Sequence, residues 1–182
     1  EPPLVNLEDY PALEAVADRA VARGIGARGL RAVLEEDVSI LSTDHCPYRK
    51  QYKYGADYLT VPCGVDGVQT RMQYLFSEGV LRRGLSMEAF ARLTASNAAR
   101  FYNLYPRKGV IRVGSDADLA LFDPRADWVY SADAIAGAAD YSIFEGLPLR
   151  GRCTCTIKGG RIVMRDGRVE AERGSGEFLF TG

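Results

Sequence analysis

The chain has 182 residues, of which 23 are Lys or Arg and 24 are Asp or Glu, giving a formal net charge of -1. This balance, without a block of basic residues, excludes the charge pattern of a nucleic-acid-binding protein or of a protein held on an anionic membrane. Hydrophobic residues make up 47% of the sequence, an ordinary globular value. No apolar run approaches the roughly 20 residues that a transmembrane helix needs. We therefore expect neither nucleic-acid nor membrane partners.

The sequence begins without methionine, and residues 1–4 lack the charged start and apolar centre of a signal peptide. These features predict a fragment or a processed piece of a longer protein. The four cysteines, at positions 46, 63, 153 and 155, do not follow a zinc-binding spacing. Cys153 and Cys155 alternate along an apparent strand, which predicts that they share one face. We expect free thiols in a reducing, cytoplasmic setting, with a disulfide as the less favoured alternative.

The first part of the chain has the pattern of α/β architecture. A helix is predicted over residues 11–23, ended by two glycines, and a shorter helix over residues 30–36. Residues 38–41 are apolar and rich in branched side chains, which is typical of a buried strand. A succession of helices followed by a buried strand favours an α/β fold.

Asp44 and His45 directly follow this predicted strand, where Pro47 opens a long loop over residues 47–66. Barrels and open α/β sheets place reacting groups at the carboxyl ends of their strands. Asp44 is therefore a candidate metal ligand or general base. On the local pattern alone a simpler role is favoured, in which Asp44 caps a turn and His45 fills a hydrogen-bonded slot.

The loop ends in the glycine-rich stretch at residues 61–67, where glycines allow either close approach to a ligand or only tight turns. A helix is predicted over residues 68–83, and another begins after the cap residue Ser86, with Met87, Phe90 and Leu93 facing inward. A further helix is predicted over residues 98–102. Strands are predicted at residues 119–122, 154–158 and 161–165, the last two joined by Gly159-Gly160 in a β-hairpin. The change from helices to strands places a domain boundary near Arg107.

Several blocks, taken in order, resemble the C-terminal portion of the hydantoinase and dihydropyrimidinase group of the amidohydrolase superfamily. Ser42–Pro47 resembles the family's Asp-His-Cys-Pro block, and Val61–Val68, followed by Arg71-Met72, resembles its Ile-Pro-Asn-Gly segment. The other matching blocks are Tyr105–Gly109, Val113–Asp118 and Asp140–Gly146. The similarity covers most of the chain from about Leu30 onward.

The resemblance implies the C-terminal part of a metal-dependent (β/α)8 barrel followed by strands of a small β-sandwich domain. Residues 1–107 would provide the last helices, the final barrel strand and the active-site loop, and residues 108–182 the C-terminal part of the sandwich. The complete protein would hold two divalent metal ions, expected to be zinc. Asp44 would bind one metal and, as catalytic residue, handle the proton of the attacking water. Cys63 and Gly64 would bind the substrate, with Cys63 in place of the family's asparagine.

The implied function is hydrolysis of a cyclic amide, by opening of a hydantoin or dihydropyrimidine ring, in a homo-oligomer of the complete protein. The implied metal centre also needs four histidines and a carboxylated lysine, whereas the chain has one histidine, His45, at a position that is not a ligand in the family. The other ligands are expected from the remainder of the barrel, in a missing segment or another chain. Alternatives are a non-catalytic dihydropyrimidinase-like assembly protein and a dihydroorotase- or allantoinase-type relative; the block at residues 140–146 favours the hydantoinase group.

Overall fold

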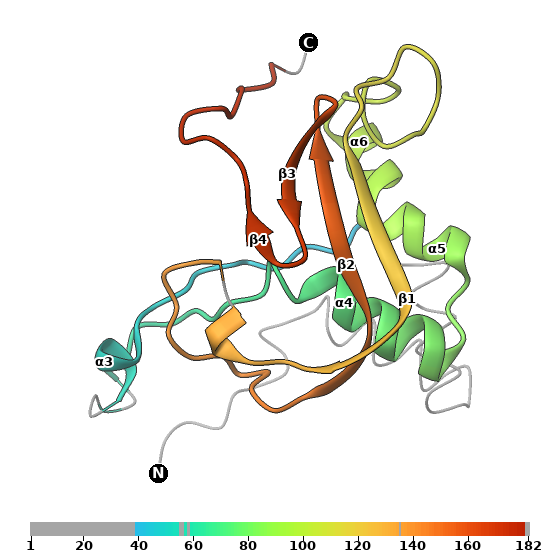
Figure 1. Ribbon diagram of the computed structural model, residues 1–182. Helices are drawn as coiled ribbons and strands as arrows, with labels where there is room; N and C mark the ends of the chain where they lie inside the picture. The colour runs from blue at the N-terminus through green and yellow to red at the C-terminus, as the bar shows by residue number, and fades with distance from the viewer. Residues whose placement is uncertain (1–38, 55–56, 58, 135, 181–182) are drawn as a thin grey trace, which may run out of the picture.

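The computed structural model describes residues 39–180 apart from residues 55, 56, 58 and 135. In this part of the chain, helices pack against a four-stranded antiparallel sheet (Figure 1). The helices predicted at residues 11–23 and 30–36 lie outside the described residues. Of the strand predicted at residues 38–41, residues 39–41 are described and lie in neither a helix nor a strand. The described residues therefore confirm a mixed α/β composition but contain no barrel strand.

The predicted strand is wrong for residues 39–41, because Ser39 and Leu41 make their hydrogen bonds to helical residues in the described part of the chain. The amide of Leu41 donates to the carbonyl of Leu93 at 3.1 Å, and the side-chain amide of Asn97 donates to the carbonyl of Ser39 at 2.8 Å. A strand exists only when its main chain pairs with a neighbouring strand. The apolar pattern of this segment predicted burial, but it could not supply the partner.

The first helical run, α4 (Arg71–Tyr74), continues directly into the π-helical η2 (Leu75–Arg82). It confirms the helix predicted over residues 68–83, although the helix begins at Arg71. The second run contains α5 (Met87–Ala91), η3 (Arg92–Ser96) and α6 (Asn97–Phe101).

The predicted cap of the second run is confirmed, since the hydroxyl of Ser86 accepts a hydrogen bond from the amide of Ala89 at 3.1 Å. The prediction of a separate helix from residue 98 is wrong. Ser96 and Asn97 have helical backbone angles, so the helix continues through them. A serine-asparagine pair favours a helix start but is also tolerated within a helix when the flanking side chains pack well.

The helices meet the sheet in an aromatic and aliphatic core. Its buried side chains are Leu75, Phe76, Leu85, Ala89, Phe90 and Leu93. Phe122 of the sheet packs against this cluster, with its ring centroid 4.9 Å from that of Phe76. Phe90 and Leu93 thus face inward as predicted, whereas Met87 is 52% exposed because it occupies the first turn of its helix, outside the core.

The sheet has the order β1-β2-β3-β4 (Figure 1). Its strands are β1 (Leu119–Val129), β2 (Pro148–Lys158), β3 (Arg161–Arg165) and β4 (Arg168–Val169), and the short helix η4 (Ala132–Ala134) follows β1. The first two are longer than predicted. A register irregularity between Asp123 and Asp127 accommodates Pro124, which the sequence pattern treats as a strand breaker.

The β2–β3 hairpin is confirmed. Gly159 and Gly160 have φ values of 54° and 78°, the left-handed pair that a tight two-residue turn needs. All four cysteines have free thiols. Cys155 pairs with Leu121 and Cys153 with Phe122, across a register shift. Because the extra residue at this bulge breaks the alternation, the two cysteines lie on opposite faces, contrary to the prediction.

Candidate functional site

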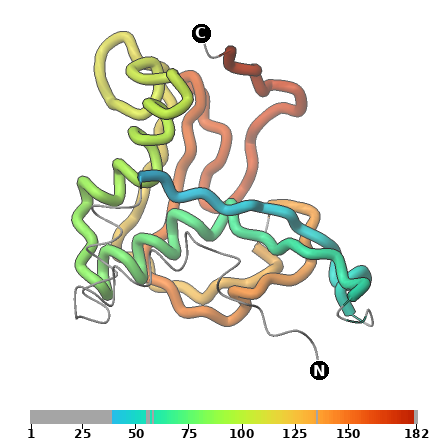
Figure 2. Tube along the Cα trace, turned by 180° about the vertical axis from the view of Figure 1, so that it is seen from behind, coloured from blue at the N-terminus to red at the C-terminus, as the bar shows by residue number. Residues whose placement is uncertain are grey.

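Residues 42–46 and 61–68 lie side by side, although a long loop with the short helix α3 (Lys50–Lys53) separates them in sequence (Figures 1 and 2). The amide of Cys46 donates to the carbonyl of Val65 at 3.0 Å. The ring Nδ1 of His45 accepts from the amides of Gly67 and Val68 at 3.1 and 3.3 Å. The two candidate blocks therefore form one structural unit.

His45 has the simpler of the two roles considered from the sequence. Its Nδ1 accepts two main-chain hydrogen bonds, so this nitrogen is an unprotonated acceptor in this arrangement. A nitrogen used in this way is not available to a metal ion. His45 therefore holds the glycine-rich segment in place, as expected for a histidine that fills a hydrogen-bonded slot.

Asp44 differs from its neighbour in exposure and backbone conformation. It is exposed, and its φ of 35° lies in the left-handed region, which is uncommon for residues other than glycine. Such conformations concentrate at functional sites, where the surrounding structure imposes them. The loop from Asp44 onward is fixed by the bonds of His45 and Cys46, so the surrounding structure accounts for this conformation.

The described residues do not by themselves fit a two-metal centre. Between residues 39 and 180, outside the four undescribed positions, no three His, Cys, Asp or Glu side chains come close enough to share a metal ion. Asp44 supplies one carboxylate, while Nδ1 of His45 is already engaged. Any such centre needs further ligands from beyond these residues.

The segment at Cys63 and Gly64 is held by α3 and by contact with Cys46. The ammonium group of Lys53 donates to the carbonyls of Pro62 and Gly64, the latter at 2.7 Å. Gly64 has a φ of 114°, and a Cβ atom there would lie 2.6 Å from the carbonyl oxygen of Cys46. Only glycine fits this close approach without displacement. Cys63 itself is exposed.

The sequence pattern did not single out Lys53, because the segment that contains the short helix α3 has no clear periodicity. Tyr48 of the same loop lies close to two thiols. The charge and hydrogen bonding of Cys46 raise the pKa of the Tyr48 hydroxyl, with a smaller contribution from Cys63. The ammonium group of Lys53 also lies 5.3 Å from the centroid of the Tyr48 ring. Tyr48 therefore interacts with Cys46 of the first block, and Lys53 joins Tyr48 to the second block.

A buried polar cluster supports the second block from the side of the sheet. Asp66 is 5% exposed, and its carboxylate accepts from the hydroxyls of Ser142 and Tyr130, at 2.9 and 3.3 Å to Oδ2. Burial is the main reason that the pKa of the Tyr130 hydroxyl is raised, and the charge of Asp66 adds to it. The residue pattern around Asp66 gave no sign of this role, since its partners lie 64 and 76 positions away.

Gln69 fastens the segment that follows β1. Its side-chain nitrogen donates to the carbonyl of Ala134 at 2.6 Å, and its side-chain oxygen accepts from the amide of Ala136 at 2.9 Å. Glutamate could make only the second of these bonds when ionised. The structure therefore explains the glutamine at this position.

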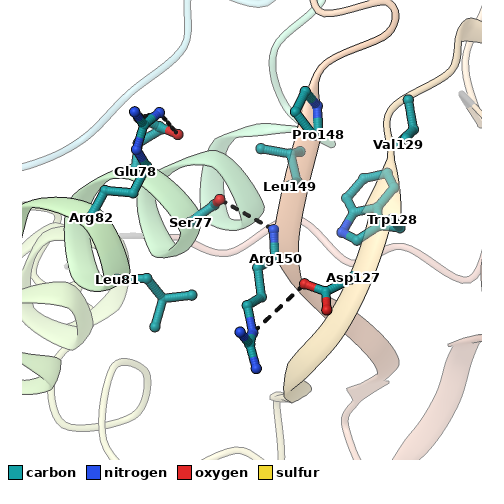
Figure 3. Close-up of a pocket in the computed structure, with 10 residues that line it drawn as sticks. All are labelled: Ser77, Glu78, Leu81, Arg82, Asp127, Trp128, Val129, Pro148, Leu149 and Arg150. Atoms are coloured by element: carbon teal, nitrogen blue, oxygen red, sulfur yellow. Dashed lines mark hydrogen bonds and ion pairs between the residues drawn. The ribbon is translucent and has the colours of Figure 1, made fainter.

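Two cavities border the helical run α4–η2. One of about 600 Å³ lies between the two blocks and α4–η2, with Thr43, Gly67 and Arg71 among its lining residues. Another of about 580 Å³ lies between η2 and the strands (Figure 3). There, Ser77 accepts from the amide of Arg150 at 3.2 Å, and Asp127 lies 3.7 Å from the guanidinium group of Arg150. Asp44, Cys63 and Gly64 line neither cavity.

A family model described as "Amidohydrolase family" matches residues 11–163. A dihydropyrimidinase from Dictyostelium discoideum is 38% identical over 145 residues, which cover 79% of this chain and 29% of that protein. A D-phenylhydantoinase from Escherichia coli is 35% identical over 164 residues, covering 82% of this chain and 35% of that protein.

Solved structures give the same result. A D-hydantoinase from Thermus sp. has a TM-score of 0.76 and 32% identity, covering 81% of this chain and 33% of that chain. An L-hydantoinase from Arthrobacter aurescens has a TM-score of 0.77 and 30% identity, covering 82% and 34%. The chain thus spans about a third of the length of these relatives. None of the helices among the described residues has the length and apolar composition of a membrane span.

Proposed function

Because the chain belongs to the amidohydrolase family, we propose that it is the C-terminal part of an enzyme that hydrolyses a cyclic amide of the hydantoin or dihydropyrimidine type. The observation that supports this most is the contact between the Asp44 block and the Cys63–Gly64 segment, in a chain similar to a dihydropyrimidinase and to hydantoinases. Ring opening is the proposed activity of the complete protein.

In this proposal Asp44 is the catalytic carboxylate. A carboxylate next to the scissile amide can accept the proton of the attacking water and pass it to the leaving nitrogen. Its exposure and the rigid attachment of the residues that follow it support this role. Asp44 would also be a metal ligand. The described residues do not complete a metal centre, so the remaining ligands are assigned to the rest of the barrel, in a longer chain or a partner chain.

The main chain at Cys63 and Gly64 is the proposed substrate contact. A ring amide is held in the cis form, so its N–H and C=O lie on one side of the ring and can pair with a donor and an acceptor of one peptide segment. Lys53 fixes the carbonyls of Pro62 and Gly64. Such contacts use main-chain atoms, so cysteine in place of asparagine preserves them.

A non-catalytic assembly protein is the second candidate. The observation in its favour is the missing ligand cluster among residues 39–180, insofar as they are described. The carboxylate at Asp44 and the contact between the two blocks favour the enzyme, because an assembly role requires neither.

The test uses the complete protein, purified and analysed for bound divalent metal, with a panel of dihydrouracil and 5-substituted hydantoins. Ring opening is followed by the loss of amide absorbance in the ultraviolet. We expect the complete protein to contain a bound divalent metal, namely zinc, and to open at least one of the two classes of ring. A well-folded protein that binds no divalent metal and opens no ring would contradict the enzyme and favour the assembly role.

A further inference from the structure

Asp66 is a buried carboxylate whose position is set by two donors from distant segments. Ser142 donates its hydroxyl to the two carboxylate oxygens at 3.1 and 2.9 Å, and Tyr130 donates to Oδ2 at 3.3 Å. Tyr130 is 1% exposed and Ser142 9% exposed. A buried carboxylate is costly unless hydrogen-bonded, so Asp66 is stable at this place only while both donors are present.

The donors are themselves held firmly. Tyr130 directly follows β1, and its amide and carbonyl bond to Leu147 and Gly146, each at 2.9 Å. Its ring packs against Phe144 with centroids 6.1 Å apart. The hydroxyl of Ser142 also accepts from the amide of Phe144 at 3.1 Å. The anchor of Asp66 therefore belongs to a packed part of the molecule.

The residues on either side of Asp66 contact the Asp44 block (residues 42–46). Val65 accepts from the amide of Cys46, and Gly67 donates to the ring of His45. Residues 62–67 belong to no helix or strand, so no regular ladder of hydrogen bonds holds them. The side chain of Asp66 thus joins the segment that faces the Asp44 block to the end of the sheet.

We propose that Asp66 is a positioning residue which, through Ser142 and Tyr130, holds the main chain of Cys63 and Gly64 where it binds the cyclic amide next to Asp44. This inference rests on the proposed function for its catalytic consequence. Its structural part, the dependence of residues 61–68 on Asp66, is independent of any activity.

The experiment compares Asp66→Ala and Asp66→Asn in the complete protein. In Asp66→Ala, we expect faster amide hydrogen exchange in peptides covering residues 61–68. We also expect KM for the cyclic amide to rise about tenfold while kcat changes by less than about threefold, since a ring contact made equally in ground and transition states affects binding. Asp66→Asn keeps an acceptor oxygen for Ser142 and should retain exchange and KM close to the parent.

Asp127→Ala is the matched control, because Asp127 is an exposed carboxylate paired with Arg150 at 3.7 Å. It should leave both readouts unchanged. If Asp66→Ala does not fold, Ser142→Ala removes one donor and replaces it in the comparison. Unchanged exchange in residues 61–68 overturns the inference, as does a fall in kcat at constant KM. If the parent protein opens no ring but Asp66→Ala still exchanges faster than the parent in residues 61–68, the positioning role is supported and the proposed function is refuted.

Discussion

At the scale of single residues, Gly64 and Gln69 determine how residues 61–68 and the neighbouring stretch after β1 lie. Gly64 allows the segment to approach Cys46, and Gln69 fastens the neighbouring stretch after β1 by two hydrogen bonds. Glycine is recognisable in the sequence as a flexible position, but the atom it must avoid is not, because Cys46 lies 18 positions earlier. The role of Gln69 likewise cannot be predicted from the sequence, because its partners Ala134 and Ala136 lie far along the chain.

Gly64→Ala should displace the 61–68 segment. The added Cβ meets the carbonyl of Cys46, and a φ of 114° is strained for alanine. We expect a loss of about 1–3 kcal/mol in the free energy of unfolding, measured by urea denaturation. Gly114→Ala is the control, since Gly114 also has a positive φ of 89° but nothing within 4 Å. Equal losses in the two variants would show that the contact with Cys46 is unimportant.

Gln69→Glu should weaken the attachment of residues 134–136. The carboxylate cannot donate to the carbonyl of Ala134 and is repelled by it. The expected loss is about 1–2 kcal/mol in the free energy of unfolding. Gln51→Glu makes the same chemical change at an exposed residue of α3 and should have little effect. A Gln69→Glu variant as stable as Gln51→Glu would contradict the role of Gln69 in holding residues 134–136.

At the scale of elements, the sequence pattern predicted correctly those features that depend on interactions between neighbouring residues. The cap at Ser86 and the Gly159-Gly160 turn depend on residues within a few positions, and both are present. A strand at residues 39–41 and the cluster around Asp66 depend on partners far along the chain. The sequence pattern therefore predicted the strand wrongly and did not predict the cluster. The domain division at Arg107 stays a prediction.

Phe76 joins the helical layer to the sheet, through Phe122 and Phe90. Phe76→Ala should therefore lower the free energy of unfolding by about 3–5 kcal/mol, because it leaves a cavity between the layers. Phe101→Ala removes the same side chain at a 71% exposed site and should cost less than about 0.5 kcal/mol. Thermal unfolding of the pair measures the difference. Similar Tm values would mean that the helices do not depend on this contact with the sheet.

At the scale of the whole molecule, an ionic cluster connects the end of the helical part to the sheet. Lys108 contacts Asp116, at 2.8 Å, and Asp118. Asp118 also accepts from the amide of Gly159 in the β2–β3 turn at 2.7 Å. Hydrogen bonds from Lys108 are the main reason that the pKa of Asp116 is lowered. For Lys108, burial lowers the pKa, but bonding to the two aspartates outweighs it and the net shift is upward.

These shifts give a defined pH dependence. A lowered aspartate pKa stabilises the fold above the unfolded value of 3.8, and this stabilisation is lost as the pH falls through the folded pKa. A raised lysine pKa stabilises the fold below the unfolded value of 10.5, and this is lost as the pH rises through the folded pKa.

Asp118→Asn tests this dependence, because asparagine keeps an acceptor for Gly159 and loses only the charge. Burial raises the pKa of Asp118, but the bonds from Lys108 and Gly159 outweigh it and the net shift is downward. We expect a lower Tm than the parent at about pH 7 and a smaller difference at an acid pH below the folded pKa of Asp118, where its carboxylate is protonated. Asp133→Asn, at an exposed aspartate, should show no such dependence. A Tm difference that does not change between the two pH values would contradict the account.

The most direct measurement of the central claim is the rate of ring opening by the complete protein carrying Asp44→Asn. Asparagine preserves the size of the side chain but cannot accept a proton from water at neutral pH. We predict loss of turnover with an unchanged Tm, while Asp57→Asn, in the same loop, keeps the parent rate because its oxygen still accepts from Leu59 and Thr60. Turnover at the parent rate in Asp44→Asn would contradict the assignment.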